Sequence, residues 1–549
     1  MELTFCGAAR RVTGSMFLLE THNHMILVDC GLSQGEDEKD TGRDFPFSPS
    51  MVEALLLTHA HIDHSGRLPQ LVKEGFDGTI YATSATTELC SIMLLDSAHI
   101  QESEAEWKSR KNKRSGLEPV EPLYTQEDAY EAMEHFQSVE YNRMITLFED
   151  VHVRFADAGH LLGSASIEVF IEEDGVTRKI VFSGDIGNTG QPIIRDPDPL
   201  ESADVVVMES TYGDRLHEKN VMSLQDRARL LAQITDRTFR RGGKLIIPSF
   251  AVGRTQEILY LYRIIIDHGM LDYAPEVFLD SPLAVRATRI FRDSIRGDYF
   301  DQEAMQLVDK GLNPVDFPSL VKTQDVEESK ALNSRREPCV IISSSGMCDA
   351  GRIKHHLKHN LWRSECTVLF VGYQANGTLG RNIVDGARHV TIFGEQIDVK
   401  AEIASLPGMS GHADRDGLEA WLHNMAKKPD KVFVVHGDEN VAPLFASRLA
   451  SEGYNACAPR LFERYDLAAR LPQQEEAVFI DRNEKIIKAA YENLEAEKKK
   501  LEKLVSRFQF AVSAVDRKDQ KRCVRLANAL ERLASDFEDL GKKWNSDPD

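Results

Sequence analysis

The sequence has few of the features that mark secreted, membrane-bound or disulfide-linked proteins. Its eight cysteines are scattered along 549 residues, and no two of them form a Cys-x-x-Cys pair. The chain begins with Met1-Glu2-Leu3-Thr4-Phe5, which lacks the basic and apolar regions of a signal peptide, and no apolar run approaches a membrane span. We therefore expect a cytoplasmic protein with reduced cysteines and no membrane partner.

Positive charge is also scarce. The chain has 66 Lys and Arg against 87 Asp and Glu, for a formal net charge of -21. This balance excludes a protein that holds polyanions by bulk charge, so a nucleic-acid substrate would have to be held by local basic patches and metal ions. The length exceeds what one ordinary core supports, so we expect two or three domains.

A dense cluster of histidines is the most informative stretch. The apolar run Val52 to Leu57 predicts a buried strand, and His59, His61, Asp63 and His64 follow it at the start of a loop. In an extended segment His59 and His61 point the same way, whereas Asp63 and His64 come one turn later. Three imidazoles and a carboxylate at this spacing are suited to zinc and could serve two adjacent metal ions.

The same pattern of an apolar strand with a polar exit recurs along the first 210 residues. Asp29 ends one such strand, His160 follows the strand Val151 to Phe155, and Asp185 follows the strand Lys179 to Ser183. These junctions predict one sheet edge that collects metal ligands. For Asp29 we favour a carboxylate that orients a ligand histidine.

From about Thr211 to His389 a second α/β pattern appears. Several of its strands end in small-residue loops at helix starts, which offer backbone N–H groups and a positive dipole to phosphate. The residues that we predict to bind substrate phosphate in these loops are Ser249, Arg254, Ser344, Ser345 and Arg381.

From about Val390 the first pattern returns, and it brings His412 and His436 to loop or strand ends. A sheet that is begun early and completed late implies an inserted domain. We therefore predict a first domain at 1–210 that is completed by 390–465, with an insertion at 211–389.

The C-terminal segment has a different pattern. Apolar residues in 481–545 fall on two helical stripes, which predicts a helical hairpin. Packing onto the enzyme or onto itself is favoured over nucleic-acid binding, and a homodimer formed through the hairpin is a further hypothesis.

The ligand pattern resembles the metallo-β-lactamase fold, whose hallmark is His-x-His-x-Asp-His followed by a later His and a later Asp. Glu209, His412 in a Ser-Gly-His context, and His436 match the additional motifs of the β-CASP branch, the nucleic-acid-processing branch that includes RNase J and the messenger-RNA 3'-end endonuclease. The resemblance covers roughly residues 1 to 460. It implies an α/β fold, namely a metallo-β-lactamase αββα sandwich with an inserted α/β β-CASP domain, to which the C-terminal helical hairpin is added.

The resemblance also implies a zinc-dependent ribonuclease with two zinc ions and a bridging hydroxide as nucleophile. Asp63, Glu209 and His412 are then the catalytic residues, with Glu209 and His412 protonating the leaving 3' oxygen. The implied metal ligands are His59, His61 and His160 for one ion, Asp63, His64 and His436 for the other, and Asp185 shared between them.

The implied substrate is RNA, bound as a single strand between the domains, because RNA-processing members carry His at the position of His436. Three alternatives stay open: a DNA nuclease of the same fold, a non-catalytic RNA-processing subunit, and a hydrolase of small esters or thioesters. The last predicts no inserted domain, and the non-catalytic subunit predicts gaps in the ligand set. The sequence does not separate endonucleolytic from 5'-to-3' exonucleolytic cleavage.

Overall fold

The computed structural model describes residues 1–37, 42–115, 117–217, 222–375 and 377–468. The predicted hairpin at 481–545, and with it the predicted dimer contact, lies outside these residues. Among the described helices, none combines the length and the apolar character that a membrane span requires.

The first sheet has the strand order β22-β1-β2-β3-β4-β5-β6. Its strands are β1 (Glu2–Phe5), β2 (Phe17–Glu20), β3 (Met25–Val28), β4 (Ala54–Leu56), β5 (Thr79–Thr83), β6 (Phe136–Val139) and β22 (Arg464–Asp466). β1 pairs antiparallel with both β2 and β22, whereas β3 to β6 run parallel. The carboxyl ends of β3 and β4 therefore meet at one edge of the sheet.

The second sheet has the order β21-β20-β11-β10-β9-β8-β7. Its strands are β7 (Ile145–Phe148), β8 (Val151–Asp157), β9 (Ala165–Glu173), β10 (Val176–Phe182), β11 (Val205–Glu209), β20 (Lys431–Val435) and β21 (Ala456–Cys457). β10, β11 and β20 are parallel neighbours, so the residues that follow them also gather at one edge.

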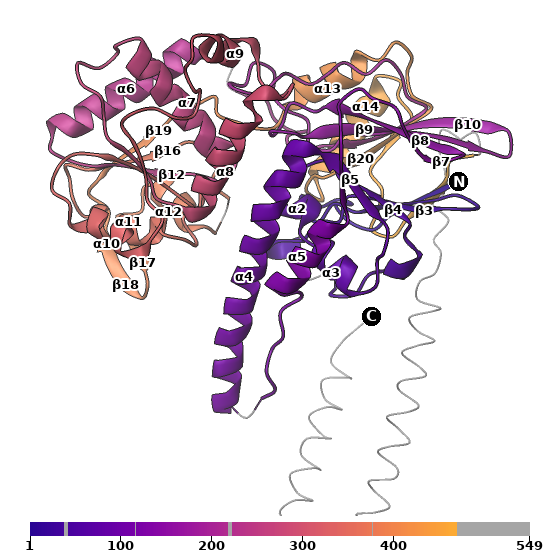
Figure 1. The fold of residues 1–549 in the computed structure, drawn as a ribbon, viewed down its shortest axis with the longest axis horizontal. Coiled ribbons are helices and arrows are strands. Elements are labelled where there is room, and N and C mark those ends of the chain that lie inside the picture. Colours follow the sequence, from indigo (N-terminus) through magenta and orange to yellow (C-terminus); the bar gives the residue numbers. More distant parts are fainter. Residues whose placement is uncertain (38–41, 116, 218–221, 376, 469–549) are drawn as a thin grey trace, which may run out of the picture. The chain divides into compact units, whose positions relative to one another are not determined.

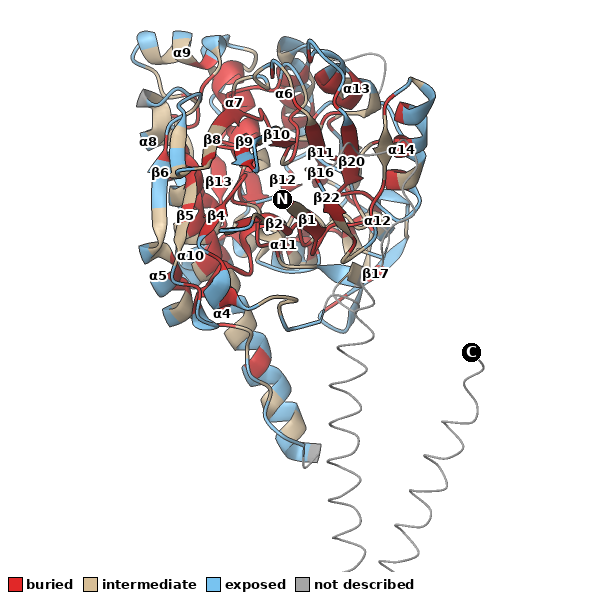
Figure 2. Ribbon diagram, turned by 90° about the vertical axis from the view of Figure 1, so that its right-hand side faces the viewer, coloured by how far each residue is buried: buried red, intermediate tan, exposed pale blue. Residues whose placement is uncertain are grey.

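The two sheets pack face to face, and helices cover their outer faces. Leu55 and Leu57 face the helical layer, whereas Leu56 between them packs in the core between the sheets, because side chains alternate along a strand. The central strands of both sheets are buried, β6 and β7 at the sheet ends are partly exposed, and the outer surfaces of the helices are exposed (Figure 2). This arrangement confirms the predicted αββα sandwich.

The first sheet is covered by α2 (Ile62–Ser65), α3 (Leu68–Lys73), α4 (Ser84–Ser115) and α5 (Gln126–Glu134). The second sheet is covered by α13 (Arg415–His423) and α14 (Val441–Ser451). In the described part of the chain, short 3-10 turns lie at η1 (Gly35–Asp37), η2 (Pro49–Met51) and η3 (Ser294–Arg296).

The inserted domain is built on a parallel sheet with the order β14-β13-β15-β12-β16-β19. Its strands are β12 (Leu245–Pro248), β13 (Val277–Leu279), β14 (Leu320–Lys322), β15 (Val340–Ser343), β16 (Thr367–Phe370) and β19 (Glu402–Ser405), with a separate hairpin of β17 (His389–Ile392) and β18 (Glu395–Asp398). Its helices are α6 (Leu224–Arg240), α7 (Arg254–Asp267), α8 (Pro282–Asp293), α9 (Gln302–Asp309), α10 (Val326–Ser334), α11 (Ile353–Asn360) and α12 (Leu379–Val384). The helices lie on both faces of this sheet (Figure 1), which is the arrangement that a parallel sheet needs.

The inserted sheet ends later in the chain than the sequence pattern indicated. β19 pairs with β16 over residues 402–405, and Val390 and Ile392 pack in the core of the inserted domain. We therefore place the end of the insertion after Ser405 instead of at residue 389. The sequence pattern placed the end too early because β19 is only partly buried and contains polar residues, so it does not resemble a core strand.

Candidate active site and metal centre

The histidine cluster lies where β4 gives way to α2. His59 continues the extended chain and is fully buried, and His61 immediately precedes α2 with φ -56° and ψ 146°. Asp63 and His64 belong to the first turn of that short helix. The change from strand to helix therefore turns the two halves of the cluster toward different points, as the spacing predicted.

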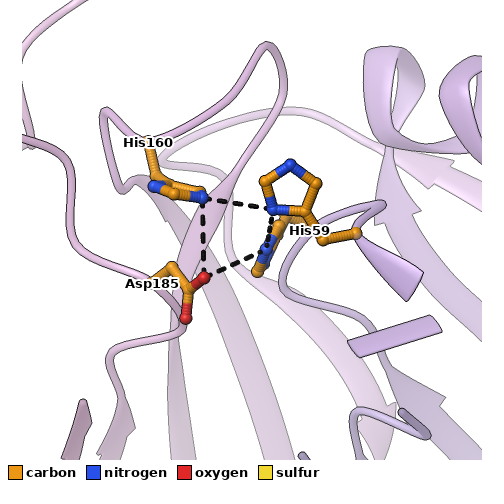
Figure 3. Close-up of side chains that lie close together, drawn as sticks. His59, His160 and Asp185 are labelled. Atoms are coloured by element: carbon orange, nitrogen blue, oxygen red, sulfur yellow. Dashed lines mark hydrogen bonds and ion pairs between the residues drawn. The ribbon is translucent and has the colours of Figure 1, made fainter. Parts of the chain in front are cut away.

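One group of side chains surrounds a point at the shared edge of the two sheets. Potential ligand atoms of His59, His61, His160 and Asp185 all lie within 4.8 Å of one another. His59 Nε2 lies 3.1 Å from His61 Nδ1, and His160 Nε2 lies 3.2 Å from the same His61 nitrogen. Figure 3 shows His59, His160 and Asp185 directed toward one another.

These separations fit a tetrahedral zinc ion. Nitrogens bound at about 2.0–2.1 Å from one ion lie about 3.3–3.4 Å apart. The chemistry of the ring nitrogens also fits: burial, followed by the charge of neighbouring His59, lowers the pKa of His61 to about 3. Burial likewise lowers the pKa of His59 and His160, so these rings are neutral and offer lone pairs at pH 7.

A second group lies beside the first and contains Asp63, His64 and His436. His64 Nε2 is 3.2 Å from His436 Nε2, and His436 Nε2 is 3.5 Å from Asp63 Oδ2. The backbone of His436 is held by a hydrogen bond from its N–H to the carbonyl oxygen of Ala8, in the loop after β1. Residues far apart in the sequence are thus brought together at one sheet edge.

Asp185 faces both groups, one with each carboxylate oxygen. Its Oδ2 lies 3.5 Å from Nε2 of both His59 and His160, and its Oδ1 lies 3.2 Å from Nε2 of His64 and 3.6 Å from Nε2 of His436. Oδ1 is buried and has no hydrogen-bond partner. A buried oxygen of this kind is costly unless something satisfies it, and a metal ion on the second group would do so.

Hydrogen bonds from outside the cluster fix the orientation of four ligand rings. Each of these rings has a partner for the nitrogen that faces away from the cluster. The pairs are Thr58 Oγ1 with His59 Nδ1 (3.1 Å), Asp29 Oδ2 with His64 Nδ1 (2.7 Å), the Gly411 carbonyl with His160 Nδ1 (3.1 Å) and Thr211 Oγ1 with His436 Nδ1 (3.0 Å). Asp29 thus lies where a ligand-orienting carboxylate should lie, whereas the sequence argument had missed Thr58, Thr211 and Gly411 in this role.

Glu209 and His412 form a pair at the rim of the two groups. His412 Nδ1 lies 3.2 Å from Glu209 Oε1, which also accepts a 2.6 Å hydrogen bond from the backbone N–H of Ile186. Burial lowers the pKa of His412, but the charge of Glu209 and its hydrogen bond outweigh this effect, and the pKa is raised to about 9. His412 is 22% exposed, so its side chain remains accessible from solvent.

The predicted phosphate-binding residues do not all lie in one place. A β-carbon built at Gly411 would lie 3.4 Å from Cε1 of His160 and 3.7 Å from Nη2 of Arg254, so Arg254 adjoins the cluster. Ser344 and Ser345 follow β15. The Ser344 hydroxyl is hydrogen-bonded to the Ser281 hydroxyl, and the Ser345 hydroxyl donates to the carbonyl oxygen of Ala350.

The other two predicted phosphate-binding residues have different surroundings. Ser249 is only 1% exposed, and its hydroxyl donates to the carbonyl oxygen of Phe250. In this arrangement Ser249 supports the shape of its loop, and phosphate binding by its side chain stays a prediction. Arg381 lies on α12 and pairs with Asp385 one turn later, at 2.6 Å.

Gln191 is a further residue that the sequence argument missed. Its side-chain amide donates to the carbonyl oxygens of Gly411 (2.6 Å) and Ser410 (3.2 Å), in the loop that carries His412. Nothing in the local sequence signals this role, because it depends on a backbone carbonyl some 220 positions away.

Three family models match the chain. The metallo-beta-lactamase superfamily matches residues 9–235, the Beta-Casp domain matches residues 255–383, and the Zn-dependent metallo-hydrolase RNA specificity domain matches residues 396–459. The order of the matches follows the split first domain and its insertion.

Curated relatives match over most of the described chain. Ribonuclease TTHA0252 of Thermus thermophilus is 38% identical over 464 residues, which cover 84% of this chain and 99% of the relative. The RNase J-like protein of Methanocaldococcus jannaschii is 31% identical over 445 residues, which cover 81% of this chain and 94% of the relative. The transcription termination factor FttA of Methanosarcina mazei is 31% identical over 458 residues, which cover 81% of this chain and 68% of the relative.

The family models, the relatives and the His/Asp cluster agree with one another and confirm the resemblance identified in the sequence. The chain belongs to the β-CASP family of metallo-β-lactamase-fold hydrolases, and it is a metal-dependent enzyme.

Proposed function

We propose that the protein is a ribonuclease that hydrolyses RNA phosphodiester bonds with two zinc ions per chain. The observation that carries this proposal is the placement of Asp185, whose two oxygens face two separate ligand groups, with the Glu209–His412 pair beside them. The matched RNA specificity domain spans His412 and His436, and two of the relatives above are named ribonuclease or RNase J-like.

Two ions fit the donor set better than one. His59, His61 and His160 would hold the first ion, Asp63, His64 and His436 the second, and Asp185 would contact both. Imidazole nitrogens and carboxylate oxygens are donors that suit zinc. When bound, zinc ions lower the pKa of water and neutralise charge on the phosphoryl oxygens.

His412 is proposed to give a proton to the leaving oxygen. Glu209 Oε1 accepts a hydrogen bond from Nδ1 of His412, which leaves Nε2 of the ring for the substrate. The Glu209 carboxylate fixes the tautomer of the ring and stabilises its protonated form. The backbone of Ile186 holds Glu209 in place, so the orientation of the donor does not depend on the substrate.

Arg254 is proposed to contact the phosphate nearest the metal ions, because its guanidinium adjoins His160 and Gly411. Ser344 and Ser345 lie at the carboxyl end of the inserted sheet, where parallel sheets bind ligands, and are proposed to contact a neighbouring phosphate. Arg381 would contribute only after it leaves Asp385. RNA would then lie as a single strand between the two domains.

The relatives named transcription termination factor favour a second assignment for the same chemistry, namely cleavage of RNA during termination. A termination factor would need partner proteins that a free ribonuclease does not need, but it would use the same active site. The same metal ligands would therefore serve both functions.

The test combines metal content with end-labelled RNA. We expect about two zinc ions per chain by elemental analysis, cleavage of single-stranded RNA, and loss of both in Asp185→Asn. Release of mononucleotides from 5'-monophosphate RNA alone would establish the 5'-to-3' exonuclease, and internal products from both 5' ends would establish the endonuclease. A protein that holds zinc and cleaves DNA but not RNA would contradict the proposal.

A further inference from the structure

An exposed ring lies close to the candidate active site and has no role in the chemistry proposed above. Tyr373 follows β16 in the inserted domain, and its side chain is 50% exposed. Covering an exposed aromatic ring removes apolar surface from water. An exposed ring beside an active site therefore marks a position where a flat ligand group can pack.

Tyr373 is connected to His412 by stacked groups. The guanidinium of Arg215 lies 5.9 Å from the centre of the Tyr373 ring and 5.4 Å from the centre of the Tyr212 ring. Tyr212 in turn meets the His412 ring edge to face, with centroids 5.8 Å apart. The three rings and Arg215 therefore form one continuous row that begins at the proposed proton donor.

Hydrogen bonds to backbone carbonyl oxygens hold the part of the row nearest His412. The N–H of Arg415 donates to the carbonyl oxygen of Arg215 (3.1 Å), and Nε2 of His217 lies 3.0 Å from the carbonyl oxygen of His412. The loop that carries Tyr212 and Arg215 is thus tied to the loop that carries His412. Tyr373 comes from the other domain, so the row joins the two domains at the site.

A second exposed ring lies on a neighbouring loop of the inserted domain. Phe250 follows β12 and is 47% exposed, and a β-carbon built at Gly346 would lie 3.0 Å from its ring. The carbonyl oxygen of Gly346 accepts a 3.1 Å hydrogen bond from Gln374, the residue after Tyr373. The loops that carry Phe250 and Tyr373 are therefore joined through Gly346.

We propose that Tyr373 is the stacking platform for a nucleobase next to the scissile phosphate, with Arg215 holding its ring. This inference rests on the proposed ribonuclease function and names how the substrate is recognised. Rings combined with an arginine are the side chains on which single-stranded RNA bases stack. Every base has a π-face, so this platform accepts any base and contributes affinity and register instead of sequence selection.

The experiment uses the full-length zinc-loaded enzyme and two substrates. One is a single-stranded RNA with a defined cleavage site, and the other is a ribose-phosphate oligomer of the same length without bases, which offers no aromatic ring to stack. Tyr373→Ala is expected to lower kcat/KM on the RNA by about 5- to 150-fold, the usual range for loss of one base stack, and to leave the base-free substrate unaffected. Tyr373→Phe keeps the ring and should retain the RNA activity.

RNAs with one abasic nucleotide identify the base that stacks on Tyr373. They are tested first on the wild-type enzyme, so this result does not depend on how the variant folds. An abasic site is moved along the RNA, and at one position it should reduce cleavage by the wild-type enzyme and cause no further loss in Tyr373→Ala. Tyr130→Ala, at a 60% exposed tyrosine on α5, is the matched control and should behave as wild type on both substrates.

Two results would overturn the platform: an equal loss of activity on both substrates, which indicates a structural role, or an unchanged kcat/KM on RNA. Hydrolysis of bis(p-nitrophenyl) phosphate, used only as a general phosphodiester probe, without any cleavage of RNA by the wild-type enzyme would instead refute the ribonuclease function on which the platform depends.

Discussion

Nδ1 of His64 donates a 2.7 Å hydrogen bond to Oδ2 of Asp29, and this contact turns Nε2 of His64 toward Asp185, 3.2 Å away. Asp29 also accepts hydrogen bonds from the backbone N–H and the hydroxyl of Thr58. The carboxylate thus braces the loop that leads into the histidine cluster as well as one ligand ring.

Asp29→Ala should weaken the second metal more than the first. Removal of a ligand-orienting carboxylate typically costs about 10- to 100-fold in metal affinity. Competition with a chelator, followed by elemental analysis, should show one zinc ion released earlier than in the wild type. Glu104→Ala, at an exposed acid on α4, is the control and should release both ions as the wild type does. Equal affinity in Asp29→Ala would contradict the orienting role.

His412→Ala should separate catalysis from metal binding. The expected result is a fall in kcat of about 10²- to 10⁴-fold with zinc content unchanged, because the variant lacks the proposed proton donor and keeps the ligands. Glu209→Gln should act in the same direction, and the two losses should not add, since the residues act as a pair. His423→Ala removes an exposed histidine on α13 and serves as the control. Loss of zinc from His412→Ala would show that the side chain is a ligand.

Gln191→Leu should reduce turnover through the loop that carries His412. The variant loses two hydrogen bonds to carbonyl oxygens, at Gly411 and Ser410, and we expect kcat to fall by roughly 5- to 150-fold. Zinc content should stay at the wild-type level. Gln126→Leu removes a comparable side-chain amide bonded to Glu102 and should leave kcat unchanged. The prediction fails if Gln191→Leu turns over RNA at the wild-type rate.

Gly187→Ala should damage the metal site although Gly187 is not a ligand. A β-carbon there would lie 1.7 Å from the carbonyl oxygen of Gly159, so the loop that carries His160 must move. We expect zinc content to fall. Gly372→Ala is the matched control, because a β-carbon at that position meets no atom within 4 Å. Full zinc content in both variants would mean that the His160 loop tolerates displacement.

The parts of the site that the sequence predicted well are those that depend on local pattern. The run from Ala54 to Leu57 is apolar because β4 is buried on both faces, and the ligands follow where this strand ends. His160 and Asp185 follow strands in the same way. β8 and β10 each pair antiparallel with β9 between them, so they run in the same direction and the residues that follow them gather at one edge.

Two of the residues that escaped prediction make contacts far away in the sequence. Thr211 bonds to His436 and Gln191 bonds to Gly411 across more than 200 positions, and no local spacing announces such contacts. The end of the insertion was misplaced for a related reason: β19 has a partly polar sequence, and its membership of the inserted sheet depends on pairing with β16.

The pairing of β1 with β22 has a consequence for how the protein is made. Residues 2–4, the first to leave the ribosome, take their antiparallel partner from residues 464–466, and the backbone of His436 is pinned to Ala8. The strands of the inserted sheet find all their partners within residues 245–405, whereas the edge of the first sheet must wait for more than 400 further residues after β1. Every nascent chain that ends before residue 436 lacks His436, so hydrolytic activity should appear only after His436 has been added and β22 has been made.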